Sequence, residues 1–340
     1  MRTGRKGSGQ MTGLERWESR IYKDGVDLIE HQGSEAGLEK AVLALYEQQV
    51  RTWPLLAAAS RLMDGVELRT VELDGRPVRL QHNPARIVNV SAPTSAEEVA
   101  NRPCPLCPHN MPDKQMALPF LDEWLVVCNP LPIFKPHFVL VNRNHLAQSA
   151  DEILPVMLEF SRLTGFVTLY NGPGCGASIP DHLHVQAAAP GWLPLEEQAP
   201  EPGGAEIVME DLLPYRIYLN ARDSSLAEKL FERTMRALEQ FKLDKEDSEP
   251  GMNIVVLAAN ANRPPLVAVH PRSKHRPDCY YAEGDLRCVI SPGSADMAGM
   301  MILPRREDFS RLDSAGVRAI IEEVCLKPSN RDRLRETLLG

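Results

Sequence analysis

Residues 182–186, His-Leu-His-Val-Gln, alternate polar and apolar side chains. Side chains two residues apart lie on the same face of a strand, so this pattern predicts a strand with one buried face and one polar face. His182, His184 and Gln186 share the polar face. Burying two imidazoles and a carboxamide without partners is costly. The strand therefore holds either locally hydrogen-bonded core histidines or a ligand, and a phosphate would account for all three side chains.

The loop before this strand favours the ligand. Residues 171–178 read Asn-Gly-Pro-Gly-Cys-Gly-Ala-Ser, and they follow an apolar run at 166–170 that is typical of a strand. Glycines let backbone amides approach a phosphate closely, and Asn171 and Ser178 add side-chain donors. A plain Gly-Pro-Gly turn is the alternative interpretation. A neutral imidazole can attack phosphorus, and the amide of Gln186 can bind a non-bridging oxygen, so the two segments together predict a phosphate site.

These segments resemble the nucleotidylyltransferase branch of the histidine-triad (HIT) superfamily, which includes galactose-1-phosphate uridylyltransferase, diadenosine tetraphosphate phosphorylase and the nucleoside-diphosphate-sugar phosphorylases. The motifs are Asn-Gly-Pro-x-x-Gly-Ala-Ser followed by His-x-His-x-Gln. Transferases of this kind carry Gln where the hydrolases usually carry a third His. The resemblance implies that His184 is the nucleophile, forming a nucleotidyl-histidine, and that Gln186 positions the α-phosphate. The residues that it implies for the phosphate site are Asn171, Gly176 and Ser178.

Cys104 and Cys107, in the segment Cys-Pro-Leu-Cys-Pro-His-Asn, are candidate metal ligands. The seven cysteines are widely spread and odd in number, which disfavours a disulfide framework and favours a metal for a close pair. The segment resembles the Cys-x-x-Cys-Pro-Gly-Asn of the uridylyltransferases, where the pair binds a structural zinc with two histidines. The matching positions here are His145 and His182, with zinc as the implied ion and iron as the alternative. Two reduced structural thiols are the other interpretation, and the rival imidazole ligands are His109 and His137.

Basic side chains supply further candidate contacts for an anionic substrate. The net charge of −8 disfavours broad nucleic-acid binding, so local basic side chains or backbone amides must bind any anionic ligand. Arg86 lies in a segment that resembles a nucleotide contact of the transferases, and its planar fork suits phosphate. A basic cluster at residues 270–277 is the second candidate, and its predicted ligands for an acceptor phosphate are Arg272, Lys274 and His275. Surface arginines and a solvated basic loop are the respective alternatives.

The hydrophobic pattern predicts an α+β fold in two similar halves. Strands, a helix and further strands precede a linker rich in Pro and Gly at residues 200–204, and the same order recurs after it. We expect a disordered or irregular lead at residues 1–35, a catalytic nucleotide-binding half at 36–199 and a second half at 205–340 that completes the substrate site. The resemblance implies that each half is a HIT-like unit, an antiparallel sheet with flanking helices.

The function implied by the resemblance is a nucleotidylyltransferase or phosphorylase. Its substrate would be a nucleoside diphosphate sugar or a dinucleoside polyphosphate, and its acceptor phosphate or a sugar phosphate. A HIT-type hydrolase and a non-catalytic nucleotide-binding module are the alternatives. The chain carries no recognisable membrane span or secretory signal, so we expect a cytoplasmic protein without membrane or nucleic-acid partners. The sequence leaves the oligomeric state open, and the resemblance favours a homodimer.

Overall fold

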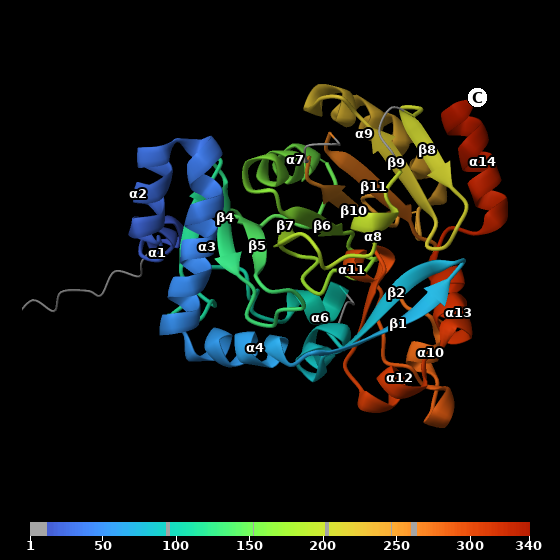
Figure 1. The fold of residues 1–340 in the computed structure, drawn as a ribbon, viewed down its shortest axis with the longest axis horizontal. Helices are drawn as coiled ribbons and strands as arrows, with labels where there is room; N and C mark the ends of the chain where they lie inside the picture. The colour runs from blue at the N-terminus through green and yellow to red at the C-terminus, as the bar shows by residue number, and fades with distance from the viewer. Residues whose placement is uncertain (1–11, 93–95, 152, 201–203, 246, 260–263) are drawn as a thin grey trace, which may run out of the picture.

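The structure is a computed structural model that describes residues 12–92, 96–151, 153–200, 204–245, 247–259 and 264–340. Its centre is a nine-stranded antiparallel sheet in the order β3-β4-β5-β7-β6-β10-β11-β9-β8 (Figure 1). In chain order these strands are β3 (Ala117–Phe120), β4 (Trp124–Cys128), β5 (His137–Asn142), β6 (Val167–Asn171), β7 (His184–Ala188), β8 (Ile207–Glu210), β9 (Arg216–Asn220), β10 (Met252–Leu257) and β11 (Leu266–Pro271). The sheet and its flanking helices confirm the predicted α+β class.

The sheet repeats one arrangement on either side of the junction between β6 and β10. Outward from this junction the order is β6-β7-β5-β4 on one side and β10-β11-β9-β8 on the other. A helix connects the equivalent strands in each half, α7 (Ile153–Thr164) between β5 and β6 and α9 (Ser224–Leu238) between β9 and β10. The two halves are therefore similar, and they share one continuous sheet. Of the linker expected between them, residues 201–203 lie outside the described residues.

Helices cover one face of the sheet. Residues of α3 (Ser34–Thr52), α7 and α9 share a hydrophobic core with Val185 and Ala187 of β7. Because side chains alternate along a strand, His184 and Gln186 point to the opposite face. That face packs against the segment at 133–134, α11 (Ser294–Met297) and β12 (Met300–Leu303). In the structure, β7 thus has the two faces that its sequence predicted, with Val185 on one face and with His184 and Gln186 on the other.

A smaller sheet joins the beginning of the chain to its later part. It contains β1 (Glu67–Leu73), β2 (Arg76–His82) and β12, with β1 antiparallel and β12 parallel to β2. Asp74 and Gly75 both have positive φ, 54° and 75°, which a tight Asp-Gly turn between β1 and β2 requires. The pairing of β2 with β12 brings the residues that follow β2 close to the nine-stranded sheet.

The remaining helices are mostly short. They are α1 (Gly13–Glu18), α2 (Lys23–Gln32), α4 (Pro54–Asp64), α5 (Ile87–Val90), α6 (Ala96–Ala100), α8 (Leu195–Gln198), α10 (Asp278–Tyr281), α12 (Arg306–Arg311), α13 (Ser314–Val324) and α14 (Pro328–Leu339), with 3₁₀ turns η1 (Pro84–Arg86), η2 (Glu239–Phe241) and η3 (Gly284–Leu286). Among the described residues, every helix is too short or too polar to cross a bilayer.

Helices α1 and α2 occupy much of the stretch that was expected to be an irregular lead. The side chain of Thr12 caps α1 in a capping box with Glu15, which is a local sequence signal for a helix start. Trp17 is buried in the same hydrophobic cluster as Cys104, and the guanidinium of Arg20 donates to the backbone carbonyls of Pro108, Met111, Pro112 and Gln115. The expectation was therefore wrong for this part of the lead, which holds the cysteine loop in place. Residues 1–11 lie outside the described residues.

Because one sheet runs through both halves, we predict that the halves unfold together. Ile254 on β10 is fully buried in the core that both halves share. Replacing a buried Ile by Ala typically costs about 2–5 kcal/mol, so Ile254→Ala should shift one cooperative urea transition, measured by circular dichroism, to lower denaturant. Leu62→Ala is the control, because Leu62 is 69% exposed. Two separate transitions, of which only one moves, would contradict this expectation.

Candidate active site

His184 is the first residue of β7, and its imidazole is 93% buried, with 7% exposed. The Nδ1–H donates to the backbone oxygen of His182 over 2.8 Å, and this bond fixes the tautomer. Burial lowers the pKa of His184 to about 4, so the ring is neutral near pH 7. No described residue contacts Nε2 by a hydrogen bond. A neutral ring with a free lone pair on Nε2 is suited to attack phosphorus.

The carboxamide of Gln186 has a fixed orientation. Its Oε1 accepts a hydrogen bond from Nε2–H of His137 over 2.9 Å, and Nδ1 of His137 accepts from the backbone N–H of Ile133 over 3.2 Å. Burial and the nearby Arg86 lower the pKa of His137 to about 3, which keeps its ring neutral. His137 therefore holds the oxygen of Gln186. The NH₂ group of Gln186 has no acceptor among the described residues and remains available as a donor.

Asn171, at the end of β6, is held in the same way. Its Oδ1 accepts from the backbone N–H of Ser294 over 2.7 Å and from Nδ2 of Asn253 over 2.9 Å. Its own Nδ2 has no acceptor within the described part of the chain. Gln148 donates to the backbone oxygens of both Asn171 and His184, over 3.1 and 2.9 Å, and so ties the two strand ends together. Two carboxamides with their oxygens engaged thus stand near His184 with free N–H groups.

A small cavity of about 40 Å³ lies beside these donors. Its lining includes Arg86, Asn171 and Gln186 from the first half and Ser291, Gly293 and Ser294 from the second. Arg86 donates from Nη1 to the backbone oxygen of Leu131, and its buried Nε has no partner among the described residues. The cavity has room for a few waters, so a whole nucleotide requires the covering segments to move apart.

The glycine loop packs against the second half of the chain. Gly176 has a φ of +93°, and a Cβ there would lie 2.7 Å from Cα of Gly293. A glycine is therefore needed at position 176 both for the positive φ and for the close contact with the backbone of Gly293. Ser178 does not line the small cavity, and its Oγ accepts from Nδ2 of Asn89 over 3.4 Å. Of the loop residues predicted to bind phosphate, the structure places only Asn171 at the cavity.

The three predicted ligands of the basic cluster in the second half do not line this cavity. Arg272 is fully buried, and its guanidinium donates to Asn253 and to backbone oxygens of Val324, Pro292, Lys274 and His275. Lys274 pairs with Asp278 and Glu323. Burial lowers the pKa of His275 to about 4, so its ring is neutral. The structure does not bring the three predicted acceptor ligands together as free cations, because protein oxygens engage Arg272 and Lys274.

Cys104, Cys107, His145 and His182 form one cluster, with all four ligand atoms within 4.8 Å of one another. Nδ1 of His182 lies 3.3 Å from Sγ of Cys104, and Nδ1 of His145 lies 3.2 Å from Sγ of Cys107. The other ring nitrogens face oxygens: Nε2–H of His182 donates to the backbone of Asn142 over 2.8 Å, and Nε2 of His145 lies 3.9 Å from Asp181. Two thiols and two imidazole nitrogens that converge in this way fit a tetrahedral metal.

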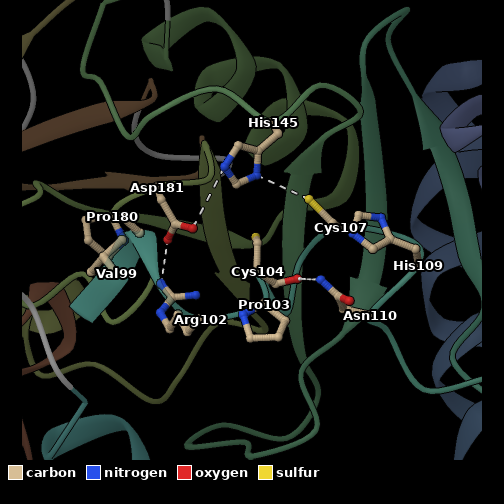
Figure 2. Close-up of a pocket in the computed structure, with 11 residues that line it drawn as sticks. Val99, Arg102, Pro103, Cys104, Cys107, His109, Asn110, His145, Pro180 and Asp181 are labelled. Carbon is tan, nitrogen blue, oxygen red and sulfur yellow. Dashed lines mark hydrogen bonds and ion pairs between the residues drawn. The ribbon is translucent and has the colours of Figure 1, made fainter. Parts of the chain in front are cut away.

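A hollow of about 800 Å³ adjoins the cluster on its solvent side (Figure 2). Figure 2 shows Arg102 and His145 on either side of Asp181. His109, one of the rival ligands, is exposed and outside the cluster. The other rival, His137, contacts Gln186 instead. Strand β7 begins two residues after His182 of the Cys/His cluster and carries His184 and Gln186.

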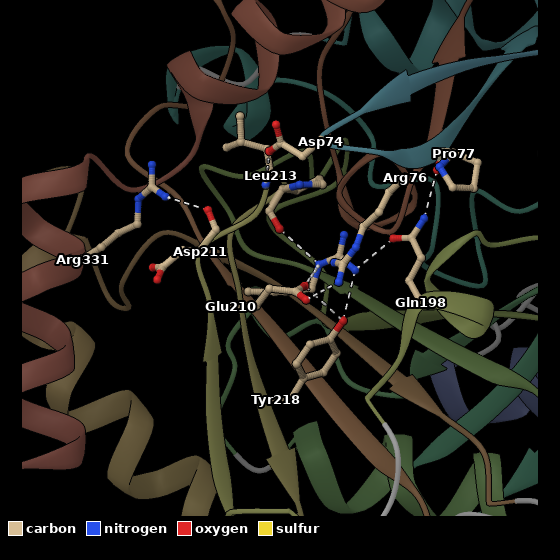
Figure 3. A network of polar contacts seen from close by, with 11 residues as sticks. Asp74, Arg76, Pro77, Gln198, Glu210, Asp211, Leu213, Tyr218 and Arg331 are labelled. Carbon is tan, nitrogen blue, oxygen red and sulfur yellow. Dashed lines mark hydrogen bonds and ion pairs between the residues drawn. The ribbon is translucent and has the colours of Figure 1, made fainter.

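A polar network holds the β1–β2 hairpin against the second half (Figure 3). Arg76 on β2 pairs with Glu210 on β8 over 2.6 Å, and the buried Arg216 on β9 donates to Tyr218 and Gln198. Gln198 in turn donates to the backbone oxygen of Pro77. Arg86 lies beyond the other end of β2, where Asn83 donates to the backbone oxygen of Pro132 and Arg86 donates to that of Leu131.

Comparisons with known proteins bear on the family and the fold of this chain. Residues 45–189 match a family model described as a domain of unknown function, DUF4922. The curated proteins contain no sequence match to this chain. Among solved structures, yeast Ap4A phosphorylase Apa2 is similar with a TM-score of 0.55 at 16% identity, over 83% of this chain and 97% of that chain. Its complex with AMP gives 0.54 at 17% identity, over 83% and 96%.

The chain has the fold of yeast Ap4A phosphorylase. The complex of that protein with Ap4A is also similar, with a TM-score of 0.53 at 16% identity, over 83% of this chain and 97% of that chain. The predicted α+β fold of antiparallel strands with flanking helices is thereby confirmed. The residues of the site come from the geometry described above.

Three residues at the site had no assigned role in the sequence analysis or were given another one. The sequence analysis named His137 as a rival metal ligand. This histidine begins an apolar strand, and a histidine in an apolar strand is the same kind of signal that marked His184. Asn253 is the one polar residue of β10, and an isolated Asn in an apolar strand is a usable signal. Gln148 lies in a loop, and nothing in its sequence surroundings marks it.

We predict that His137 stays neutral, as the Nε2–H tautomer, from pH 8 down to about pH 4. Its folded pKa of about 3 lies below the value of about 6.5 in an unfolded chain. The contribution of this site to stability is therefore complete above pH 6.5 and declines as the pH falls towards 3. ¹⁵N NMR of the histidine rings measures the tautomer and the titration, with His137→Asn used to assign the signal. A titration midpoint near 6.5 would be inconsistent with the contacts described.

Proposed function

We propose that this protein is a nucleotidyl-transferring enzyme that carries the nucleotide covalently on Nε2 of His184. The observation that supports this most directly is the state of His184, a buried neutral ring whose Nδ1–H is held by the backbone of His182. Catalysis through such an intermediate divides one difficult transfer into two displacements. The free N–H groups of Asn171 and Gln186 beside it supply what a charged phosphorus centre needs.

In the first displacement, Nε2 of His184 attacks the α-phosphorus of the substrate. The N–P bond forms as the bond from phosphorus to the leaving phosphate oxygen breaks, and the electron pair leaves with that oxygen. The imidazole then carries positive charge, which the hydrogen bond from Nδ1–H to His182 stabilises. Asn171 and Gln186 donate to the non-bridging oxygens, and Arg86 provides positive charge at the cavity.

In the second displacement, an acceptor oxygen attacks the same phosphorus and the N–P bond breaks. The electron pair returns to Nε2, so the ring is neutral again. With inorganic phosphate as the acceptor the product is a nucleoside diphosphate, and the enzyme is a phosphorylase. With a sugar phosphate it is a transferase. Among the substrate classes we favour a dinucleoside polyphosphate, because the similar yeast protein is an Ap4A phosphorylase that was solved with AMP and with Ap4A.

We further propose that Cys104, Cys107, His145 and His182 hold a structural zinc ion. Their converging ligand atoms and the oxygen partners of both Nε2 atoms support this set. A bound zinc would crosslink the cysteine loop, the end of β5 and the start of β7. His182 would then be fixed from two sides, and its backbone oxygen holds Nδ1–H of His184. The role of the metal would be to hold this geometry.

The adduct is the first test. Incubation with Ap4A in the absence of phosphate should add the mass of one nucleoside monophosphate to the protein, detected by mass spectrometry of the intact chain under alkaline conditions. His184→Ala should abolish the adduct and reduce turnover by at least about 10⁴-fold, as removal of a covalent nucleophile does elsewhere. Adding inorganic phosphate should release ADP, whereas release of AMP would indicate a hydrolase.

The matched control for this test is His31→Ala. His31 lies in the last turn of α2, is exposed and belongs to neither cluster. It should form the adduct as the wild type does. The proposal fails if wild-type protein that contains its metal forms no adduct with Ap4A, ADP-glucose or UDP-glucose, or if His184→Ala retains full turnover.

The metal proposal is tested by elemental analysis. Purified protein should contain about one zinc ion per chain, and Cys107→Ser should lose it. Because metal binding is coupled to folding, removal of zinc with a chelator should lower the melting temperature. Cys279→Ser is the control, because Cys279 is a thiol outside the cluster, and it should keep the ion. Zinc retained by Cys107→Ser would argue against this ligand set.

A further inference from the structure

A buried line of hydrogen bonds runs from the second half of the chain to the proposed phosphate site. Nη1 of Arg272, directly after β11, donates to Oδ1 of Asn253 on β10 over 2.5 Å. Nδ2 of Asn253 donates to Oδ1 of Asn171 on β6 over 2.9 Å. Arg272 and Asn253 are fully buried and Asn171 is 8% exposed. We refer to Arg272, Asn253 and Asn171 as the amide relay.

Hydrogen-bond chemistry gives the relay one direction. A guanidinium can only donate, so Asn253 must turn its oxygen towards Arg272. Its NH₂ group then faces two acceptors, Oδ1 of Asn171 and the backbone oxygen of Cys175 at 2.6 Å. The backbone N–H of Ser294, which is also a donor only, meets the same Oδ1 of Asn171. Both donors to the side chain of Asn171 thus require its oxygen to point into the protein, and its NH₂ group is left to face the cavity.

Arg272 is itself held firmly. Its other donors bind backbone oxygens of Val324, Pro292, Lys274 and His275. A buried charge with this many partners cannot turn away without leaving donors unsatisfied, which is costly in a dry interior. The direction of the relay is therefore set at its far end by the backbone of the second half, and no exposed group takes part.

The relay crosses the sheet where the two halves meet. Asn171 and Asn253 are opposite each other in the register of β6 and β10, whereas the next pairs in that register are Tyr170 with Ile254 and Leu169 with Val255. If this position served packing alone, another pair of apolar residues would suffice here. A polar pair backed by a buried arginine is the more costly solution, and it is found only at the end of the junction nearest to His184.

We propose that Asn253 and Arg272 are positioning residues for the reaction, which act by holding Asn171 with its N–H groups towards the phosphate. This inference rests on the proposed function, in which Asn171 donates to a non-bridging oxygen. In the opposite orientation Asn171 would present its oxygen to a negatively charged phosphate. Asn253 and Arg272 would then serve catalysis through the neutral amide of Asn171, without lining the cavity themselves.

Asn253→Asp tests the relay with almost no change in volume. The carboxylate still accepts from Arg272, but it cannot donate to Asn171. A carboxylate oxygen then faces Oδ1 of Asn171, while the N–H of Ser294 still donates to that atom. The side chain of Asn171 either moves away from the carboxylate or turns over against Ser294, and in both cases its N–H groups are no longer held towards the phosphate. We expect the single-turnover rate of adduct formation with Ap4A to fall about 10²-fold in the folded variant, comparable to the loss of one oxyanion donor, while its zinc content stays near that of the wild type.

Asn220→Asp is the matched control. It makes the same chemical change at the end of β9 in the second half, where Nδ2 of Asn220 donates to the backbone oxygen of Ala205. Its adduct rate should equal that of the wild type. A folded Asn253→Asp variant with an adduct rate within about twofold of the wild type would overturn the relay. Absence of the adduct in the wild type would instead overturn the proposed function.

A second measurement covers the case in which Asn253→Asp does not fold. The side-chain NH₂ signals of Asn171 in ¹H–¹⁵N spectra of the wild type, assigned with Asn171→Asp, should shift when AMP is added. In folded Asn253→Asp they should be insensitive to AMP. If these signals do not move in wild-type protein that binds AMP, as measured by calorimetry, Asn171 does not face the phosphate and the relay is wrong.

Discussion

The pairing of β6 with β10 is the constraint on which the rest of the structure depends. It makes one sheet out of two similar halves, and it fixes where the ends of the strands lie. His184 and Asn171 belong to the first half, but the groups that hold Asn171 belong to the second. Since strand register is set by alternation of buried side chains, a slip at this junction would turn Asn171 and Asn253 to opposite faces.

The hydrogen bonds that the site can offer a ligand depend on which atom of each carboxamide, the oxygen or the nitrogen, is already bonded to the protein. Gln186 and Asn171 have their oxygens engaged, one by a neutral histidine and one by a relay that ends in an arginine. The charged group is kept at a distance and acts through intermediate amides. A site of this kind offers directed donors with few free cations beside the nucleophile. This arrangement also explains why a chain with a net charge of −8 can present a surface suited to phosphate.

The sequence was sufficient to predict the features that depend on local alternation or on a close pair of residues. The two faces of β7 and the close pair Cys104 and Cys107 were found in this way, because their spacing reflects strand geometry or ligand chemistry. The resemblance supplied the pairing of Cys104 and Cys107 with His145 and His182. Nothing in the local pattern required those segments to meet.

The basic cluster shows why the rest could not be predicted. Arg272, Lys274 and His275 look like anion ligands in sequence, since charge is visible there and partners are not. In the fold, carbonyls and carboxylates from residues up to about fifty positions away engage Arg272 and Lys274. The roles of Gln148 and Asn253 were hidden for the same reason, because each depends on contacts between distant segments.

The parallel pairing of β2 with β12 has a consequence for how the protein acquires activity. Arg86 follows β2, whereas Ser294 and the segment that covers the cavity directly precede β12. The small sheet therefore cannot form until the ribosome has released residue 303, and a nascent chain contains His184 long before it has a complete cavity. Contacts of such long sequence separation slow folding. His184, the proposed nucleophile, is thus synthesised early, and the cavity beside it is completed late, so an incomplete chain carries this histidine without a complete cavity.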